Sequence, residues 1–138
     1  MKLLIADCRL QIGDVRLAAL CMVTCLFATP AFAATCDGLA SLALKDAKIT
    51  SAKVVAAGQF APPGGRGGAG ANSPYKTLPE FCRVEATLTP STDSDIKVEV
   101  WLPTANWNGK FQGVGNGGWA GVISYSAMGE AVRAGDAT

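Results

Sequence analysis

The 138-residue sequence contains no histidine. A Ser-His-Asp triad needs an imidazole that takes the proton of the serine, so this chain cannot hold a complete triad. An excess of charge is also missing, because twelve basic residues stand against eleven acidic ones and the net charge is +1. That balance leaves no electrostatic footprint for nucleic acid, and we expect no nucleic-acid partner. Charged residues make up only 17% and apolar residues 49%, a composition typical of a chain that buries a core.

Long apolar runs are scarce as well, and the main one covers residues 17–29. Basic residues precede it, and small residues of the kind that a signal peptidase accepts follow at 31–33, which is the three-part layout of a secretory signal. The run is too short to span a bilayer comfortably, and a retained membrane anchor is the alternative interpretation. We therefore expect a signal peptide at 1–33, cleaved after Ala33. The single domain at 34–138 is then expected in the periplasm or outside the cell, without membrane association.

Removal of this signal would leave two of the five cysteines, Cys36 and Cys82. Two cysteines in an exported chain most simply form one disulfide. Closing a loop of this size stabilises a fold by about 4 kcal/mol on the chain-entropy model, before any strain is subtracted. The alternatives are two free thiols, or disulfide partners that lie beyond residue 138.

Alternation of apolar and polar residues predicts antiparallel strands in the middle of the chain. The clearest examples are residues 81–88 and 96–102, which both alternate with period two and are joined by a polar turn at 90–95. Residues 49–57 are rich in β-branched side chains and predict a third strand. The glycine- and proline-rich stretch at 61–74 predicts a loop.

Helical signals are shorter. Asp37 is expected to cap a helix that ends near Lys45. Apolar residues at helical spacing predict a second helix over residues 124–134, with Gly135 as its C-terminal stop. Between the strands and this helix, residues 111–112 are expected to open a further strand that runs into a glycine-rich turn.

That turn, at residues 113–118, fits the G-x-G-x-x-G pattern of dinucleotide-binding loops, and Asp136 follows at a suitable distance. However, the predicted helix begins several residues after the glycines, and no strand separates it from Asp136, so we reject a dinucleotide site. The other use of such a turn is an oxyanion hole, in which a backbone N–H binds a substrate carbonyl. Local sequence alone favours a third interpretation, an ordinary glycine turn beneath Trp119.

Four segments change that balance, because together they resemble the N-terminal part of the tannase and feruloyl esterase family. The segments are Ile49–Val55, Leu78–Pro90, Ser94–Pro103 and Trp107–Gly121. The resemblance covers nearly all of residues 36–138, and its last block is the most specific. Members of this family are exported serine esterases with an α/β-hydrolase core, a large lid and several disulfides. They cleave esters of phenolic acids such as gallate or ferulate, and some relatives cleave a terephthalate monoester.

The resemblance implies roles for only a few residues. The family's oxyanion loop matches residues 115–118, with Gly117 and Gly118 as candidate N–H donors and Gly117 as the first choice. The family's N-terminal disulfide matches Cys36 with Cys82. The family's serine lies in a Cys-Ser-x-Gly-Gly turn that this sequence lacks, so no catalytic residue is assigned here. The lid, which carries a calcium site in some members, is also absent, and we assign no cofactor to this chain.

We therefore expect an α/β structure, the N-terminal portion of an α/β-hydrolase fold truncated before the nucleophile elbow. It would contain the leading antiparallel strands, the oxyanion loop and the first helix. The parent protein is expected to be a secreted or periplasmic serine carboxylic-ester hydrolase acting on small aromatic esters, and this chain to be inactive alone.

The alternative is a non-enzymatic secreted β-rich module that binds a ligand or glycan. In that case Trp101, Trp107 and Trp119 would form a stacking platform. A further candidate feature is the pair Asp93 and Asp95, whose spacing suits calcium. Because such a pair in a turn is usually only solvated, we assign it no metal.

Overall fold

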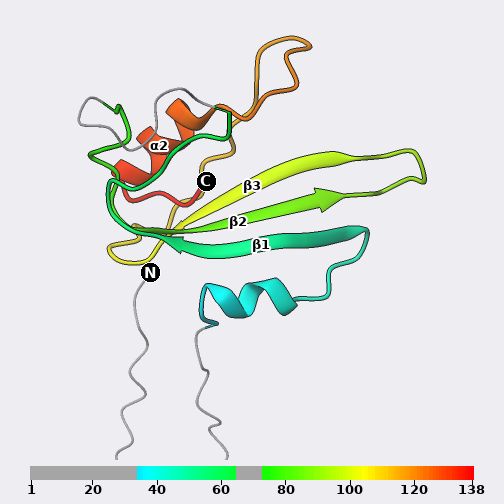
Figure 1. Ribbon diagram of the computed structural model, residues 1–138, viewed down its shortest axis with the longest axis horizontal. Helices are drawn as coiled ribbons and strands as arrows, with labels where there is room; N and C mark the ends of the chain where they lie inside the picture. The colour runs from blue at the N-terminus through cyan, green and yellow to red at the C-terminus, as the bar shows by residue number, and fades with distance from the viewer. Residues whose placement is uncertain (1–33, 65–72) are drawn as a thin grey trace, which may run out of the picture. The chain divides into compact units, whose positions relative to one another are not determined.

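The computed structural model describes residues 34–64 and 73–138. The expected signal peptide and the centre of the expected loop at 61–74 lie outside the described residues. Within these described residues, five elements follow one another (Figure 1). They are the 3₁₀ helix η2 (Asp37–Ser41), strands β1 (Ala47–Val55), β2 (Phe81–Leu88) and β3 (Ile96–Pro103), and helix α2 (Tyr125–Arg133). The described part is thus a mixed α/β structure, in agreement with the expected class.

The three strands form an antiparallel sheet in the order β1-β2-β3. Its pairing places Val84 of β2 between Ala52 of β1 and Val100 of β3. The predicted strands are confirmed: β2 has the expected bounds, β3 is one residue longer, and β1 begins and ends two residues earlier than expected. The predicted second helix is confirmed as α2, and Gly135 follows it with a φ of 84°, which an L-amino acid rarely adopts.

Residues beyond β3 extend the sheet by backbone hydrogen bonds. Trp101 N–H donates to the Thr138 carbonyl at 2.7 Å, and Thr138 N–H donates back to the Trp101 carbonyl at 3.0 Å. This reciprocal pair is an antiparallel contact. On its other side, Ala137 forms a parallel bridge with Phe111. Residues 136–138 therefore lie between the edge of β3 and residues 110–112.

The strand expected to open at residues 111–112 is wrong in extent, because the structure has only the isolated bridge of Phe111 with Ala137. The Phe111 side chain is 65% exposed, and the glycines that follow supply no side chains to pack against the sheet. Without cross-strand packing a strand has little to stabilise it.

Both faces of the sheet are covered, although unequally. Helix α2 and the segments around Phe60 and Leu78 pack on one face, and their core consists of Phe60, Leu78, Phe81, Trp101, Met128 and Val132. The opposite face holds a smaller cluster of Ala52, Cys82 and Val84 beside η2. The strand alternation alone does not predict this inequality, because the face that carries the charged residues of β2 and β3 also carries Phe81 and Trp101.

The helix expected from Asp37 to about Lys45 is wrong in length. Only a short 3₁₀ segment forms, Cys36 occupies the capping position, and no side chain accepts a cap hydrogen bond there. Thr35 Oγ1 instead accepts from Gly38 N–H at 3.2 Å. Leu42 and Leu44 are about half exposed. Their apolar side chains therefore gain too little burial to stabilise a longer helix.

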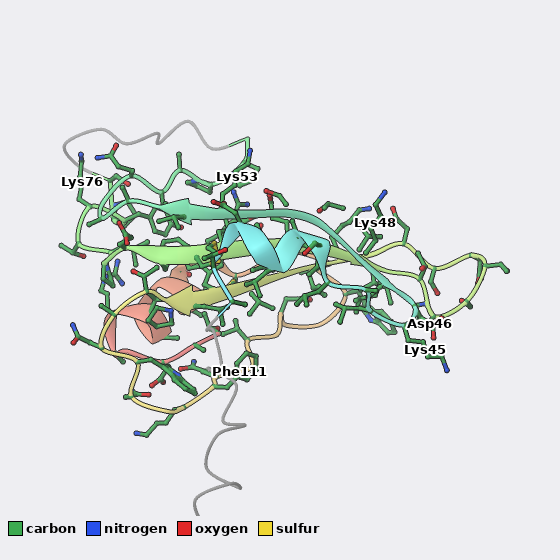
Figure 2. The ribbon with its side chains drawn as sticks, turned by 90° about the horizontal axis from the view of Figure 1, so that it is seen from below. Lys45, Asp46, Lys48, Lys53, Lys76 and Phe111 are labelled. Atoms are coloured by element: carbon green, nitrogen blue, oxygen red, sulfur yellow. A yellow bond between two sulfur atoms is a disulfide. The ribbon has the colours of Figure 1, made fainter. Side chains whose placement is uncertain are left out.

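The expected disulfide between Cys36 and Cys82 is present and joins the residue before η2 to strand β2, with 5.6 Å between the Cα atoms. Figure 2 shows η2 lying across the sheet, with Lys45 and Asp46 at the turn that leads into β1 and Lys48 within that strand. The Asp46 carbonyl accepts from Thr89 N–H at 2.8 Å, which joins this turn to the residue after β2. Within the described ranges, no helix is both long and apolar enough to cross a membrane.

Candidate oxyanion loop and the adjoining groove

The glycine-rich loop at residues 113–121 lies between the Phe111 bridge and helix α2. A Cβ added to any of its five glycines would meet no other heavy atom within 4 Å. Steric space therefore does not require glycine in this loop, but backbone conformation favours it at Gly118 and Gly121, whose φ angles are 56° and 59°. One side-chain contact braces the loop, from Gly121 N–H to Asn116 Oδ1 at 3.3 Å.

The two candidate donors, Gly117 and Gly118, are neighbours in the exposed part of this loop. Neither N–H has a hydrogen-bond partner among the described residues. Both groups are thus available to a carbonyl oxygen that approaches from solvent, as an oxyanion donor must be. Their role in catalysis stays a prediction.

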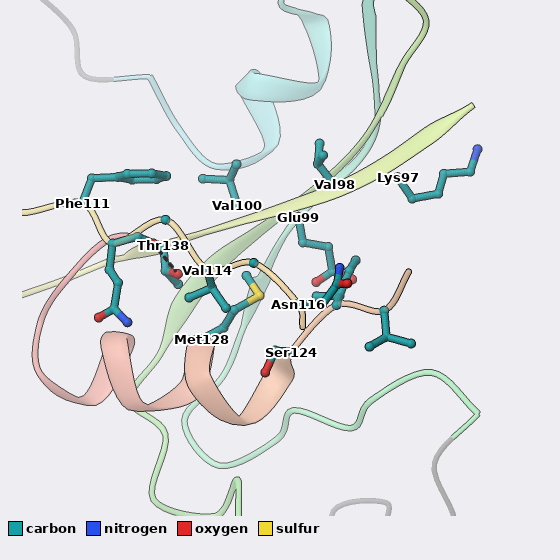
Figure 3. A pocket seen from close by; sticks show the side chains of 15 residues that line it. Lys97, Val98, Glu99, Val100, Phe111, Val114, Asn116, Ser124, Met128 and Thr138 are labelled. Carbon is teal, nitrogen blue, oxygen red and sulfur yellow. Dashed lines mark hydrogen bonds between the residues drawn. The ribbon is translucent and has the colours of Figure 1, made fainter. Parts of the chain in front are cut away.

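A groove of about 320 Å³ runs beside the loop (Figure 3). One wall is formed by residues 97–100 of β3 and the other by residues 113–116, while Met128 and Thr138 also contribute to the lining. Gly117 and Gly118 are not among the lining residues. The structure therefore brings the first half of the glycine-rich loop to the groove and leaves the two candidate donors outside it.

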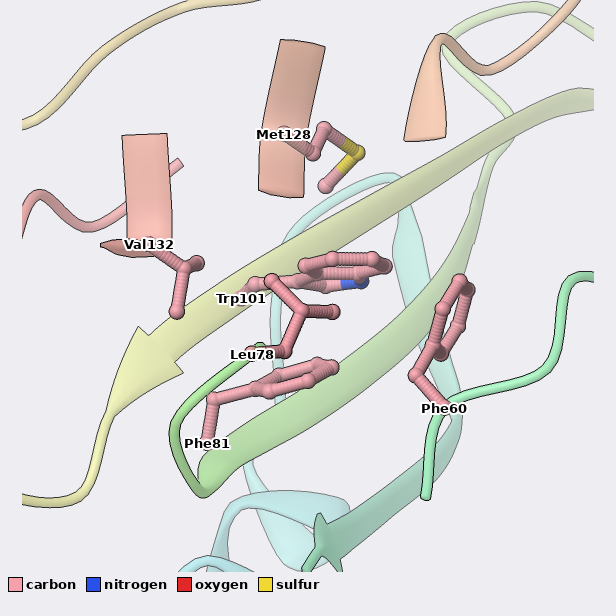
Figure 4. Packing of buried hydrophobic residues seen from close by; sticks show 6 residues of the cluster. All are labelled: Phe60, Leu78, Phe81, Trp101, Met128 and Val132. Carbon is pink, nitrogen blue, oxygen red and sulfur yellow. The ribbon is translucent and has the colours of Figure 1, made fainter. Parts of the chain in front are cut away.

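A buried polar cluster that the sequence did not predict lies beneath the groove. The Glu99 side chain is only 4% exposed. One of its carboxylate oxygens accepts from Arg83 Nε at 2.8 Å, and the other accepts from Arg83 Nη2 at 2.6 Å. It also accepts from Trp101 Nε1 at 2.9 Å and from the Tyr125 hydroxyl at 2.8 Å. Figure 4 shows Trp101 between Met128 and Phe81 in the core. The cluster thus ties β2 and β3 to the first residue of α2.

The hydrogen bonds of this cluster decide its charges. Burial by itself would raise the pKa of Glu99, but the donors Arg83, Trp101 and Tyr125 outweigh it and hold the pKa below the usual glutamate range. Burial, and then the hydrogen bond to the Glu99 carboxylate, raise the pKa of Tyr125 to about 12. The bond to Glu99 also raises the pKa of Arg83. Glu99 therefore stays ionised with both oxygens occupied, which suits a structural anchor and not a proton-transfer group.

Other candidate residues do not converge on the loop. Asp136 accepts from the Asn108 side chain. Asp93 accepts from Ser91, and Asp95 pairs with Lys97, so these two carboxylates engage separate partners. No group of three possible metal ligands occurs in the part of the chain that the structure describes.

The alternative prediction of a stacking platform formed by three tryptophans is wrong. Trp101 has no exposed surface and stacks on Phe81, with 4.3 Å between the ring centroids. Only Trp107 and Trp119 are exposed. Trp101 therefore belongs to the core, and a platform that needs all three rings cannot form.

Comparison with known proteins finds similar sequences among proteins named as esterases. The chain is 39% identical over 124 residues to an uncharacterized esterase of Xanthomonas campestris pv. campestris, a match that covers 90% of this chain and 20% of the relative. It is 44% identical over 61 residues to feruloyl esterase C of Talaromyces stipitatus, covering 44% of this chain and 11% of the relative. The chain is related to the tannase and feruloyl esterase family. No family model matches it.

A third relative is a probable feruloyl esterase B-1 of Aspergillus oryzae, 39% identical over 69 residues, which are 50% of this chain and 13% of that protein. The expected family resemblance is thus confirmed. The chain spans a fifth or less of the length of each of these three relatives.

Proposed function

We propose that this chain forms the oxyanion-holding N-terminal portion of a serine carboxylic-ester hydrolase with an α/β-hydrolase core. The observation that carries the proposal is the order of residues 110–138: a bridge-forming segment, a glycine-rich loop, helix α2, and a second segment parallel to the first. A helix that joins two parallel strands is the βαβ connection of α/β proteins. In an α/β-hydrolase, the loop after the third strand supplies one N–H of the oxyanion hole.

The chemistry proposed for the loop is stabilisation of charge. When a serine attacks an ester carbonyl, the carbonyl oxygen becomes negative in the tetrahedral intermediate, and an N–H aimed at it lowers the barrier. Gly117 offers such an N–H on an exposed loop, and no described atom lies where a side chain at this position would begin. The serine, its histidine and its carboxylate would come from outside these 138 residues, with the serine in a Cys-Ser-x-Gly-Gly turn.

The substrate and the compartment are part of the same proposal. The names of two relatives, feruloyl esterase C and probable feruloyl esterase B-1, support an ester of a phenolic acid of the ferulate or gallate type. The disulfide supports an oxidising compartment, because such bonds persist mainly in exported proteins. The expected signal at 1–33 supports the same assignment. Any calcium would belong to a lid outside this chain.

The first test uses the disulfide-bonded 138-residue chain itself. Because it lacks the nucleophile and its base, we expect no turnover of ethyl ferulate or methyl gallate above the rate of the buffer. Hydrolysis that a serine-directed inhibitor abolishes would contradict the assignment of the chain as an incomplete esterase.

The second test compares two substitutions at one position in the full-length enzyme. Gly117→Pro removes the backbone N–H, whereas Gly117→Ala keeps it and serves as the matched control. We expect the proline variant to lower kcat about 10²–10³-fold beyond the alanine variant, as loss of one oxyanion donor does. Ground-state binding, read from KM, should change little. Equal kcat values in the two variants would remove Gly117 from the oxyanion hole.

A further inference from the structure

Two asparagines of the chain are directly followed by glycine. Asn108 precedes Gly109 in the turn before the Phe111 bridge, and Asn116 precedes Gly117 in the glycine-rich loop. This dipeptide is the one most open to deamidation, because glycine has no Cβ to keep its backbone nitrogen away from the asparagine side chain. Both asparagines are exposed. Since the two pairs share one local chemistry, the fold around each side chain decides which one reacts.

The side-chain amide of Asn108 is held by the fold on both sides. Its Nδ2 donates to the Ala134 carbonyl at 3.0 Å and also to Asp136, and its Oδ1 accepts from Lys110 N–H at 3.0 Å. These hydrogen bonds must break before the amide can turn toward the next backbone nitrogen. The Asp136 carboxylate also opposes the negative charge that an attack places on the amide group. The structure therefore protects Asn108.

Asn116 has the opposite surroundings. Its Nδ2 has no hydrogen-bond partner among the described residues, and its Oδ1 accepts only from Gly121 N–H, at 3.3 Å. That hydrogen bond polarises the side-chain carbonyl and stabilises the negative oxygen that forms when its carbon is attacked. The Gly117 N–H is also without a partner in the described part of the chain, and open space surrounds the position of a Cβ there. The nitrogen and the carbonyl carbon are thus free to approach each other.

We propose that Asn116 is a modification site, at which the chain deamidates in preference to Asn108. A base in the solvent takes the proton of Gly117 N–H, and the nitrogen attacks Cγ of Asn116. The new C–N bond closes a succinimide ring, the bond from Cγ to Nδ2 breaks, and Nδ2 leaves as ammonia with a proton from the solvent. Water then opens the ring at either carbonyl to give aspartate or isoaspartate. One water is consumed, one ammonia is released, and nothing is oxidised or reduced.

The attacking nitrogen is the same one that is proposed above as the oxyanion donor. In the succinimide this nitrogen carries no hydrogen, so Gly117 has nothing to donate. Aspartate at position 116 restores the N–H but places a negative carboxylate beside it, which repels an oxyanion. Isoaspartate lengthens the main chain by one carbon and displaces the N–H, and a displacement of about 1 Å costs about 10²-fold in rate. The loss of catalysis rests on the proposed function, whereas the modification itself does not.

The first test incubates the disulfide-bonded 138-residue chain in a mildly alkaline buffer and follows both asparagines by mass spectrometry. Trypsin cuts after Lys110, so Asn108 and Asn116 fall in different peptides. We expect Asn116 to deamidate about tenfold or more faster than Asn108, because the hydrogen bonds of Asn108 must first break. In concentrated urea with the disulfide reduced, the two rates should become similar.

Two variants provide matched controls. Gly117→Ala places a Cβ beside the attacking nitrogen and should slow the reaction at Asn116 without changing that at Asn108. Asp136→Ala removes one acceptor of Asn108 and should speed the reaction at Asn108 without changing that at Asn116. Equal rates at the two asparagines in the folded chain would overturn the proposal. The same rate difference in urea would also overturn it, since the difference would then come from local sequence and not from the fold.

The second test measures the catalytic consequence in the full-length enzyme. After incubation in the same buffer, kcat should fall in proportion to the fraction of Asn116 that is modified, and Gly117→Ala should slow both changes together. A kcat that stays constant while Asn116 is modified would overturn the catalytic consequence and would count against Gly117 in the oxyanion hole, but it would leave the modification site in place. Absence of modification at Asn116 in the full-length enzyme would overturn the catalytic consequence without bearing on the ester chemistry.

Discussion

Two neighbouring regions next to strand β3 are built in opposite ways. Around Glu99, the buried polar groups of the side chains are hydrogen-bonded to one another, and aromatic rings enclose the ion pair with Arg83. Around Gly117, the backbone is exposed, a single side-chain hydrogen bond braces the loop, and Trp119 is fully exposed. The first region stabilises the fold, whereas the second presents backbone groups to solvent.

The contrast shows how the chain positions a loop without packing it. Tyr125, the first residue of α2, is fixed by Glu99, and the other end of the loop is fixed by the bridge between Phe111 and Ala137. Both ends of the loop are thus anchored, while a Cβ added at any of its glycines would meet no neighbouring atom. Substitutions should therefore be costly at the anchors and inexpensive at loop glycines without a positive φ, such as Gly117, unless catalysis is measured.

The largest effect is expected from Glu99→Gln. The change keeps the shape but removes the charge that Arg83, Trp101 and Tyr125 share, and it should lower the free energy of unfolding by about 2–4 kcal/mol. The matched control is Glu85→Gln, because Glu85 pairs with the same arginine at 2.9 Å but is more exposed. It should cost at most about 0.5 kcal/mol. Urea denaturation followed by near-UV circular dichroism measures the free energy of unfolding of both variants. Equal destabilisation would contradict a special anchoring role for Glu99.

Low pH should remove part of the same contribution to the free energy of unfolding. The pKa of Glu99 is lower in the folded state than in the unfolded chain, so its contribution is complete above the unfolded value of about 4.3 and is lost as the pH falls through the folded value. At the alkaline end, the pKa of Tyr125 is raised to about 12, so its contribution is lost as the pH rises above its ordinary value of about 10. Unfolding measured across the pH range should show both limbs. The Glu99→Gln variant should have a shallower acid limb; an unchanged limb would assign acid sensitivity to other carboxylates.

The smallest effects compare two glycines. Gly135→Ala should destabilise the fold by about 1–2 kcal/mol, because an L-residue resists a positive φ. Its φ is 84°, and its Cβ would lie 3.0 Å from the Asn106 carbonyl oxygen. Gly117→Ala should change stability by less than about 0.5 kcal/mol, since nothing surrounds that position. Thermal unfolding of the two variants provides the measurement. A large loss at Gly117 would mean that the loop is packed after all.

Strands and helix α2 could be predicted from sequence because their signals are local. The alternation in β2 and β3 and the spacing of Met128 and Val132 follow from backbone geometry alone. The Glu99 cluster was missed because Arg83 and Glu99 become neighbours only through the β2–β3 register, which alternation does not specify. The helix after Asp37 and the strand at Phe111 are shorter than predicted for the converse reason. Their local patterns indicate longer elements, but tertiary packing does not stabilise them.

The distribution of the three tryptophans gives the chain two optical probes. Trp101 lies in the core, so its emission reports the integrity of the sheet and α2. Trp119 has its whole ring in solvent on the glycine-rich loop, so its emission and its quenching by iodide report whatever covers that loop, whether other parts of a longer protein or a bound ester. Trp107 is partly shielded and donates to the Lys110 carbonyl at 2.9 Å. Folding of the core and burial of the loop can thus be followed separately in one fluorescence cuvette, without an added label.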